Sequence, residues 1–100
     1  MRSKVMDKVF ELIQEMRRSR GWDNSDTLPI LIKSVSVEAA ELLETIQWDE
    51  DNIDMRAVES ELADVLMYAL SICIDYDMDV ETIIRNKINN VYERYPEVKK

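Results

Sequence analysis

Two pairs of acidic residues in this chain have a spacing that could support metal chemistry. Glu38 and Glu41 form one pair, Glu61 and Asp64 form the other, and the members of each pair are three positions apart. Residues with this spacing lie on the same side of an α-helix. Ionised carboxylates that come close together repel one another unless they take up protons or share a cation. The pattern therefore indicates a divalent cation bound by oxygen ligands.

The rest of the composition restricts the kind of metal. The chain has no histidine and one cysteine, so an all-oxygen ligand set is expected. Such a set suits Mg²⁺ or Mn²⁺ better than zinc, and it lacks the Glu-x-x-His pattern of di-iron bundles. Either acid pair alone would more often belong to a solvated helix face than to a metal site, so the interpretation depends on the two pairs facing each other.

Four helices are predicted to position these acids, because apolar residues recur at helical spacing in four segments. These segments are residues 3–20, 28–47, 55–76 and a last stretch that begins after the N-cap Asp79 and ends near Tyr95, just before Pro96. The polar residues 21–27 are predicted to be a loop. The residues predicted to face the core are Val5, Val9, Leu12, Ile13 and Met16; Leu31, Ile32, Val35, Ala39, Leu42, Leu43 and Ile46; Val58, Leu62, Val65, Leu66, Ala69, Ile72 and Cys73; and Val80, Ile83, Ile84, Ile88 and Val91.

Each acid pair lies at the edge of the apolar stripe on its own helix. The stripe of residues 28–47 is centred near Val35, with Glu38 at its border and Glu41 one step further round. On residues 55–76, Glu61 and Asp64 have the same relation to the stripe. If these two helices pack antiparallel through their short connection, all four carboxylates can converge across one groove.

The composition favours a single all-α domain over residues 1–100, an antiparallel four-helix bundle. One glycine and two prolines leave little material for tight turns, whereas helix-forming residues are plentiful. A chain of 100 residues buries a modest core by itself, and sharing a core between subunits would relieve this. A homodimer or homotetramer is therefore expected.

The net charge of −8 argues against binding to a nucleic-acid polymer, while a small triphosphate could still bind through divalent cations.

The single cysteine and the absence of apolar runs indicate a cytoplasmic protein. Cys73 has only apolar immediate neighbours and is expected to be a buried thiol in a reducing compartment. The N-terminus lacks the apolar stretch of a signal peptide, and no segment approaches the ~20 apolar residues of a membrane span. No membrane partner is expected.

At the acid pairs the chain resembles the MazG-like superfamily of all-α nucleoside triphosphate pyrophosphohydrolases. The hallmark of that superfamily is Glu-x-x-Glu, a spacer, and Glu-x-x-Asp. Here it reads Glu38-Ala-Ala-Glu41, a spacer of 19 residues (42–60), and Glu61-Leu-Ala-Asp64. The terminal Lys87-Ile-Asn-Asn-Val-Tyr-Glu-Arg-Tyr-Pro96 agrees as well, so the likeness covers nearly the whole chain.

The resemblance implies hydrolysis of a nucleoside or deoxynucleoside triphosphate to the monophosphate and pyrophosphate, with Mg²⁺ bound by the four acids. Either one of the acids or the metal would then activate the attacking water, while phosphate charge is neutralised in the transition state. The physiological task would be the clearing of non-canonical or surplus nucleotides. The resemblance does not assign the general base, the number of metal ions, or the preferred base and sugar.

By the same resemblance, six further residues are expected to contact the substrate. Aromatic residues at matching positions would surround the base, and residues of the last helix would contact phosphate, sugar or base. They are Trp22, Trp48, Tyr68, Lys87, Asn90 and Arg94. Each also has a simpler interpretation, in which the aromatic residues cover the ends or border of the core and the charged ones are solvated. Some relatives have a histidine before the Glu-x-x-Glu motif where this chain has Ser34 and Ser36, so a selectivity that depends on that histidine is not carried over.

Two alternatives remain open from the sequence. One is an enzyme like phosphoribosyl-ATP pyrophosphohydrolase, which has a similar fold and metal chemistry. The other is a non-catalytic helical adaptor with the same fold, for which Mg²⁺ should matter little.

Overall fold

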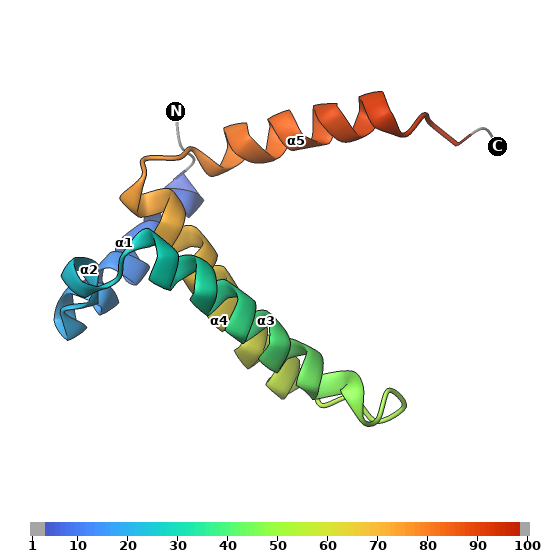
Figure 1. Cartoon of the computed structure of the whole chain (residues 1–100), viewed down its shortest axis with the longest axis horizontal. Coiled ribbons are helices and arrows are strands. Elements are labelled where there is room, and N and C mark those ends of the chain that lie inside the picture. Colours follow the sequence, from blue (N-terminus) through green and yellow to red (C-terminus); the bar gives the residue numbers. More distant parts are fainter. Residues whose placement is uncertain (1–3, 99–100) are drawn as a thin grey trace.

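A computed structural model of the chain describes residues 4–98, and this part of the chain consists of helices and short connections without strands (Figure 1). The all-α prediction is confirmed. There are five helices: α1 Lys4–Arg20, α2 Trp22–Ser25, α3 Leu28–Gln47, α4 Met55–Asp75 and α5 Val80–Arg94.

Local signals explain where these helices begin and end. Gly21 follows α1 with a φ of 73°, a left-handed conformation that glycine adopts without steric cost. The side chain of Asp54 accepts hydrogen bonds from the backbone N–H groups of Arg56 and Ala57, at 3.0 and 3.4 Å, and thereby caps α4. The predicted N-cap Asp79 is confirmed, because its carboxylate accepts from Thr82 N at 3.1 Å.

The predicted boundaries agree closely with the structure, with one correction. The range 28–47 is confirmed for α3, and α4 ends one residue before the predicted position 76. The start of the first helix was predicted at Ser3, which lies outside the described residues. Residues 22–25 were predicted to be loop but form the single turn α2, closed by a 2.9 Å hydrogen bond from Asp26 N to the Trp22 carbonyl. A run this short shows no helical periodicity, which is why the pattern missed it.

The antiparallel pair of α3 and α4 is the body of the molecule, and α1 packs against α4 near the free end of this hairpin (Figure 1). The connection between α3 and α4 is held by Asp49, whose carboxylate accepts from Asp51 N at 3.1 Å and from Asn52 N at 3.2 Å. The hairpin places the middle of α3 opposite the middle of α4, and the acid pairs lie in these two segments.

The buried core is small and lies where α1 meets the hairpin. Its apolar members are Phe10, Ile13, Leu31, Cys73 and Val80. The prediction for Cys73 is confirmed, and burial raises the pKa of its thiol. Two polar residues, Arg17 and Ser71, are buried with this core.

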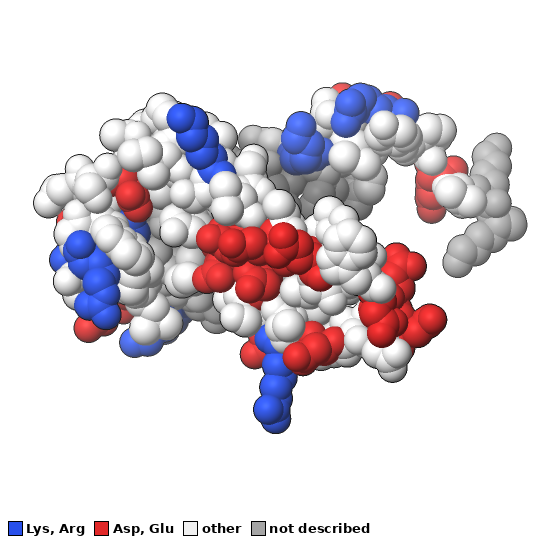
Figure 2. All heavy atoms as spheres, turned by 60° about the horizontal axis from the view of Figure 1, so that its bottom comes forward, with Lys and Arg blue, Asp and Glu red and all other residues white. Residues whose placement is uncertain are grey.

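The surface is acidic, and Figure 2 shows a continuous patch of acidic side chains in the middle of one face.

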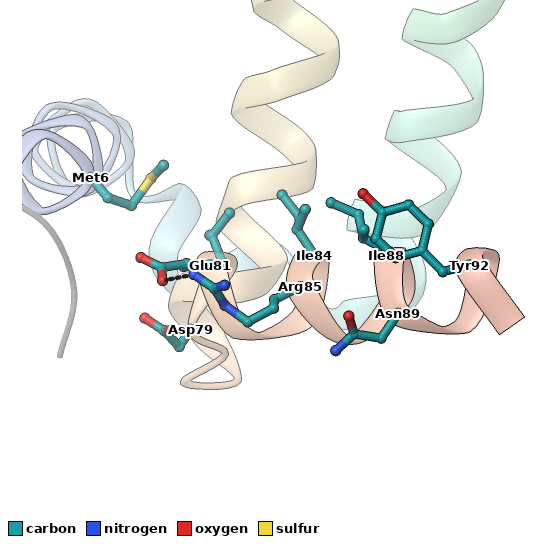
Figure 3. Close-up of a pocket in the computed structure, with 9 residues that line it drawn as sticks. Met6, Asp79, Glu81, Ile84, Arg85, Ile88, Asn89 and Tyr92 are labelled. Carbon is teal, nitrogen blue, oxygen red and sulfur yellow. Dashed lines mark hydrogen bonds and ion pairs between the residues drawn. The ribbon is translucent and has the colours of Figure 1, made fainter. Parts of the chain in front are cut away.

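The last helix does not pack as predicted. α5 has no extensive contact with another helix and leads away from the body (Figure 1). Of the residues predicted to be buried there, only Val80 is, and Ile83, Ile84, Ile88 and Val91 are between 37% and 52% exposed. Figure 3 shows Ile84, Ile88 and Tyr92 on one side of α5, along a groove of about 600 Å³. The four-helix bundle is therefore not confirmed within one chain.

Many residues predicted to face the core on the other helices are also exposed, among them Val5, Leu12, Ile32, Leu43, Leu62 and Leu66. The chain exposes 8261 Å², whereas a compact monomer of 11.8 kDa would expose about 5,900 Å². Its radius of gyration is 16.4 Å, compared with about 13 Å for a compact domain of this length. One chain thus leaves its apolar faces uncovered.

Within residues 4–98, every helix is too short or too polar to serve as a membrane span.

Candidate metal and substrate site

Three of the four predicted acids converge in the middle of the α3–α4 hairpin. Glu38 of α3 and Glu61 and Asp64 of α4 each place one carboxylate oxygen within 4.8 Å of the others. All three side chains are half-buried, because their positions at the edge of the apolar stripes turn them toward the facing helix. The Oε2 atoms of Glu38 and Glu61 are buried and have no hydrogen-bond partner. Buried carboxylate oxygens without a partner are costly unless a cation or a proton compensates them.

The fourth acid, Glu41, lies beside this cluster and is more exposed. The pKa of Glu38 is raised from 4.5 to about 7. The largest cause of this shift is hydrogen bonding with the carboxyl of Glu41, and burial and the charges of Glu41, Asp64 and Glu61 add to it. The pKa of Glu61 is also raised, first by desolvation and then by the charges of Glu41 and Asp64. The four predicted acids thus form one electrostatic unit, although only three of them form the compact oxygen cluster.

The chemistry of this cluster fits a hard divalent cation. All donors are carboxylate oxygens, two of which are buried without a partner, and the nearby residues bring no thiolate or imidazole. Oxygen ligands of this kind suit Mg²⁺ or Mn²⁺. A cation would also offset the mutual repulsion that adds to the raised pKa values of Glu38 and Glu61.

A cavity of about 260 Å³ opens directly beside the acids. Two of the predicted aromatic residues, Trp22 and Tyr68, line it together with Glu38 and Asp64. The complete lining is Met16, Arg17, Trp22, Asp26, Glu38, Asp64, Met67, Tyr68 and Ser71. Desolvation in this cavity, followed by the charges of Glu38 and Asp26, raises the pKa of Tyr68. Aromatic and thioether walls next to a cluster of acids suit a flat ring attached to a phosphate chain.

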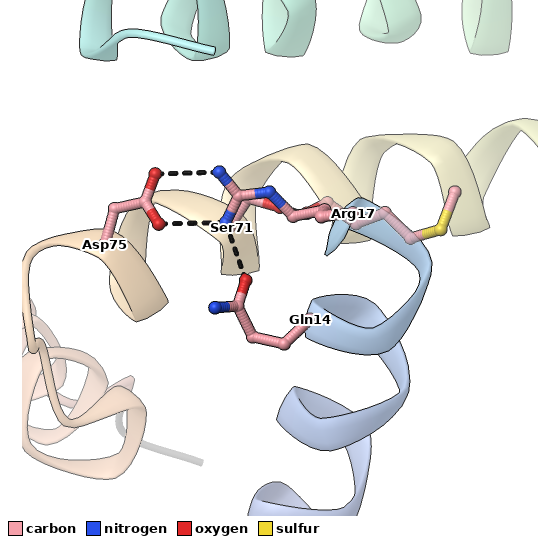
Figure 4. Close-up of polar contacts among 5 residues, drawn as sticks. Gln14, Arg17, Ser71 and Asp75 are labelled. Atoms are coloured by element: carbon pink, nitrogen blue, oxygen red, sulfur yellow. Dashed lines mark hydrogen bonds and ion pairs between the residues drawn. The ribbon is translucent and has the colours of Figure 1, made fainter. Parts of the chain in front are cut away.

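Sequence analysis missed three polar residues of this cavity, Arg17, Asp26 and Ser71. Arg17 lies in the last turn of α1 and is only 2% exposed. Its Nη1 and Nη2 atoms donate to the two carboxylate oxygens of Asp75 at 2.9 and 2.8 Å, and Nη1 also donates to Gln14 at 3.0 Å (Figure 4). A signal was available, because Arg17 continues the buried spacing of Phe10 and Ile13 on α1.

Four predicted substrate residues are not brought to the acids within one chain. Trp48 follows the last turn of α3 and is 85% exposed. It is ten residues beyond Glu38, which corresponds to about 15 Å along a helix axis. Lys87, Asn90 and Arg94 lie on α5 and are exposed. Since α5 leads away from the hairpin (Figure 1), these three side chains are separated from their own acid cluster.

Comparison with known proteins gives consistent matches. A family model described as the MazG-like family matches residues 33–100. Among curated proteins, dCTP pyrophosphatase 1 of Mus musculus is 24% identical over an alignment of 101 residues. The alignment covers 92% of this chain and 59% of the mouse protein. The chain therefore spans about three fifths of that relative. Among solved structures, a pyrophosphatase from Archaeoglobus fulgidus superposes with a TM-score of 0.86 at 32% identity, covering 97% of each chain.

Proposed function

Because the chain belongs to the MazG-like family, we propose that it is a Mg²⁺-dependent nucleoside triphosphate pyrophosphohydrolase that removes surplus or non-canonical nucleotides. It would convert a nucleoside or deoxynucleoside triphosphate and water to the monophosphate and pyrophosphate. The observation that carries this proposal is the cluster of Glu38, Glu61 and Asp64 beside a cavity with aromatic walls. An adaptor of the same fold would not require two buried, unpartnered carboxylate oxygens.

Each group in the site has a defined task in this proposal. Glu38, Glu41, Glu61 and Asp64 hold Mg²⁺, with Mn²⁺ as a substitute. A bound cation supplies neutralisation of the phosphate charge that develops during hydrolysis. One of the four carboxylates takes the proton of the attacking water, and the partly closed cavity limits the access of other water to the base. Trp22 and Tyr68 provide the aromatic walls against which the base lies.

We further propose that the chain forms a homo-oligomer, a dimer or a tetramer, whose subunits complete each other's sites. The chain exposes about 2,300 Å² more than a compact monomer of its size, which exceeds the ≈800 Å² per partner of a standard interface. The apolar groove along α5 (Figure 3) is part of this surface. A second copy that covers these faces would bring Lys87, Asn90 and Arg94 to a neighbour's acids, and Trp48 to the edge of a shared site.

A product assay tests the function. The purified protein is incubated with Mg²⁺ and a panel of triphosphates, starting with dCTP because of the mouse relative's name, and phosphoribosyl-ATP is included. We expect monophosphate and pyrophosphate in equal amounts, and no activity after chelation of the metal. Turnover of phosphoribosyl-ATP alone would reassign the reaction to that class. Failure to hydrolyse any substrate with either Mg²⁺ or Mn²⁺ would favour the adaptor.

A second expected result links metal binding to pH. The pKa of Glu38 is about 7 without a cation, compared with 4.5 ordinarily, so the folded state binds more protons than the unfolded state between these values. Stability of the metal-free protein should then fall as pH rises from about 4.5 to 7, and level off above this window. Since the cation requires the ionised form, and the ionised fraction of Glu38 falls from about one half at pH 7 to about one tenth at pH 6, its affinity should drop roughly fivefold over this range.

Differential scanning calorimetry at pH 6 and pH 8, with and without Mg²⁺, measures this linkage. The increase in Tm on adding Mg²⁺ should be larger at pH 8, and Glu38→Gln should remove both the pH dependence and most of the increase. Glu59→Gln, which changes an exposed acid of α4 two positions before Glu61 and outside the cluster, is the matched control and should behave like the wild type. An equal Mg²⁺ effect at both pH values would contradict the assignment of Glu38.

A further inference from the structure

The cavity beside the acids has a polar edge to which the family resemblance assigns no role. Arg17 and Asp26 contribute to it and line the cavity together with the acids Glu38 and Asp64. Both terminal nitrogens of the Arg17 guanidinium, Nη1 and Nη2, donate to the carboxylate of Asp75 at 2.9 and 2.8 Å (Figure 4). Asp75 thereby compensates the charge of Arg17. Of the two N–H groups that these bonds leave over, Nε–H is on a buried atom without a hydrogen-bond partner, and the whole side chain is only 2% exposed.

A buried N–H group without a partner is rare in folded proteins and is unfavourable by about 1–3 kcal/mol. Here the guanidinium cannot turn to satisfy it, because the bidentate pair with Asp75 and the bond to Gln14 fix its plane. A ligand atom in the cavity that accepts a hydrogen bond would remove this penalty. The structure thus holds an unpartnered N–H donor in a side chain that lines the cavity.

Asp26 supplies the complementary acceptor. Its backbone N–H donates to the Trp22 carbonyl at 2.9 Å, which fixes the backbone of Asp26 to the turn that carries this aromatic wall of the cavity. The carboxylate is half-buried and has no hydrogen-bond partner among those resolved for residues 4–98. It lies close enough to Arg17 and Tyr68 for its charge to raise the pKa of both groups. An ionised carboxylate can only accept hydrogen bonds.

We propose that this cavity binds the base of the triphosphate and that Asp26 and Arg17 select bases with an exocyclic amino group, such as cytosine and adenine. This inference rests on the proposed function. Asp26 would accept from the amino group while Arg17 Nε donates to the adjacent ring nitrogen. Uracil, thymine and hypoxanthine carry a carbonyl oxygen in place of the amino group, and that oxygen repels a carboxylate. The ring N–H of uracil lies between two carbonyl oxygens, so a carboxylate that reaches it meets the same repulsion.

The test compares matched pairs of nucleotides that differ in this one group. kcat/KM is measured with Mg²⁺ for dCTP against dUTP and for ATP against ITP. A correctly paired base edge contributes about 1–3 kcal/mol of discrimination, so the wild type should favour the amino base in each pair by about tenfold or more. Asp26→Asn can present an N–H to a carbonyl oxygen and should lower each ratio by about tenfold. Asp23→Asn, in the same helical turn but outside the cavity, should leave the ratios unchanged.

Calorimetric titration with dCMP and dUMP separates this inference from the proposed activity. Preferential binding of dCMP that is lost in Asp26→Asn, with unchanged Tm, supports the base pocket even for a protein that hydrolyses nothing. Hydrolysis of all triphosphates at ratios that Asp26→Asn does not alter would overturn the role of Asp26 and leave the proposed function standing. Equal binding of dCMP and dUMP by the wild type would overturn it as well.

Discussion

Replacing Glu61 by Gln or Asp64 by Asn should lower kcat/KM for triphosphate hydrolysis by about 10³-fold, with a smaller effect on the fold. Each substitution removes one negative charge from a cluster whose oxygens lie within 4.8 Å of one another, while the side chain keeps its shape. Loss of one group that stabilises transition-state charge typically lowers the rate by about 10²–10³-fold, and loss of a metal ligand also weakens cation binding. Release of pyrophosphate, measured over a range of Mg²⁺ concentrations, checks this.

Glu59→Gln is again the matched control, since it removes the same charge from α4 outside the cluster. Its kcat/KM should stay within about twofold of the wild type, as is usual for exposed positions without partners. Higher Mg²⁺ should recover part of the activity of Asp64→Asn if the defect lies in cation binding. Full activity of Glu61→Gln at low Mg²⁺ would be incompatible with the proposed ligand set.

Two inactive variants should restore each other's activity when they are mixed. Lys87→Ala removes a proposed phosphate contact from α5, and Glu61→Gln removes an acid from α4. If α5 serves the acids of a neighbouring subunit, a mixed dimer contains one site with both defects and one intact site. Random reassociation of equal amounts should then give roughly a quarter of the wild-type activity. The variants are mixed, unfolded in denaturant, refolded together, and assayed for pyrophosphate release.

The control for this experiment is a mixture of Glu61→Gln with Asp64→Asn. Both substitutions lie on α4 in the same acid cluster, so every mixed site keeps one defect and no recovery is expected. Sedimentation of each variant establishes that it still associates. If Lys87→Ala and Glu61→Gln remain inactive together while both associate normally, α5 does not contribute to a neighbour's site.

The hairpin and its acids could be predicted because they depend on local pattern. The apolar period of residues 28–47 gave both ends of α3, and the short connection required α4 to run antiparallel to it. Once the two stripes face each other, the positions of Glu38 and Glu61 at the stripe edges determine that they meet. The same reasoning placed Asp79 at the start of α5, since capping involves only its immediate neighbours.

The direction of α5 could not be predicted in this way, because an apolar stripe specifies that a face becomes buried and does not specify against which molecule. Ile84 and Ile88 carry the same pattern whether they pack on their own chain or on another. The burial of Arg17 could not be predicted either, because charged residues are usually solvated. Its burial depends on Asp75, which is 58 positions away, a distance that no local pattern spans.

The exposed apolar faces have a consequence for how much working protein a cell obtains from each synthesised chain. Where folding is completed only by association, the folded fraction depends on the total amount of the chain. At low abundance a larger share would remain partly folded and open to proteolysis. Activity would therefore rise more steeply than in proportion to expression, so that a modest increase in synthesis gives a larger increase in activity.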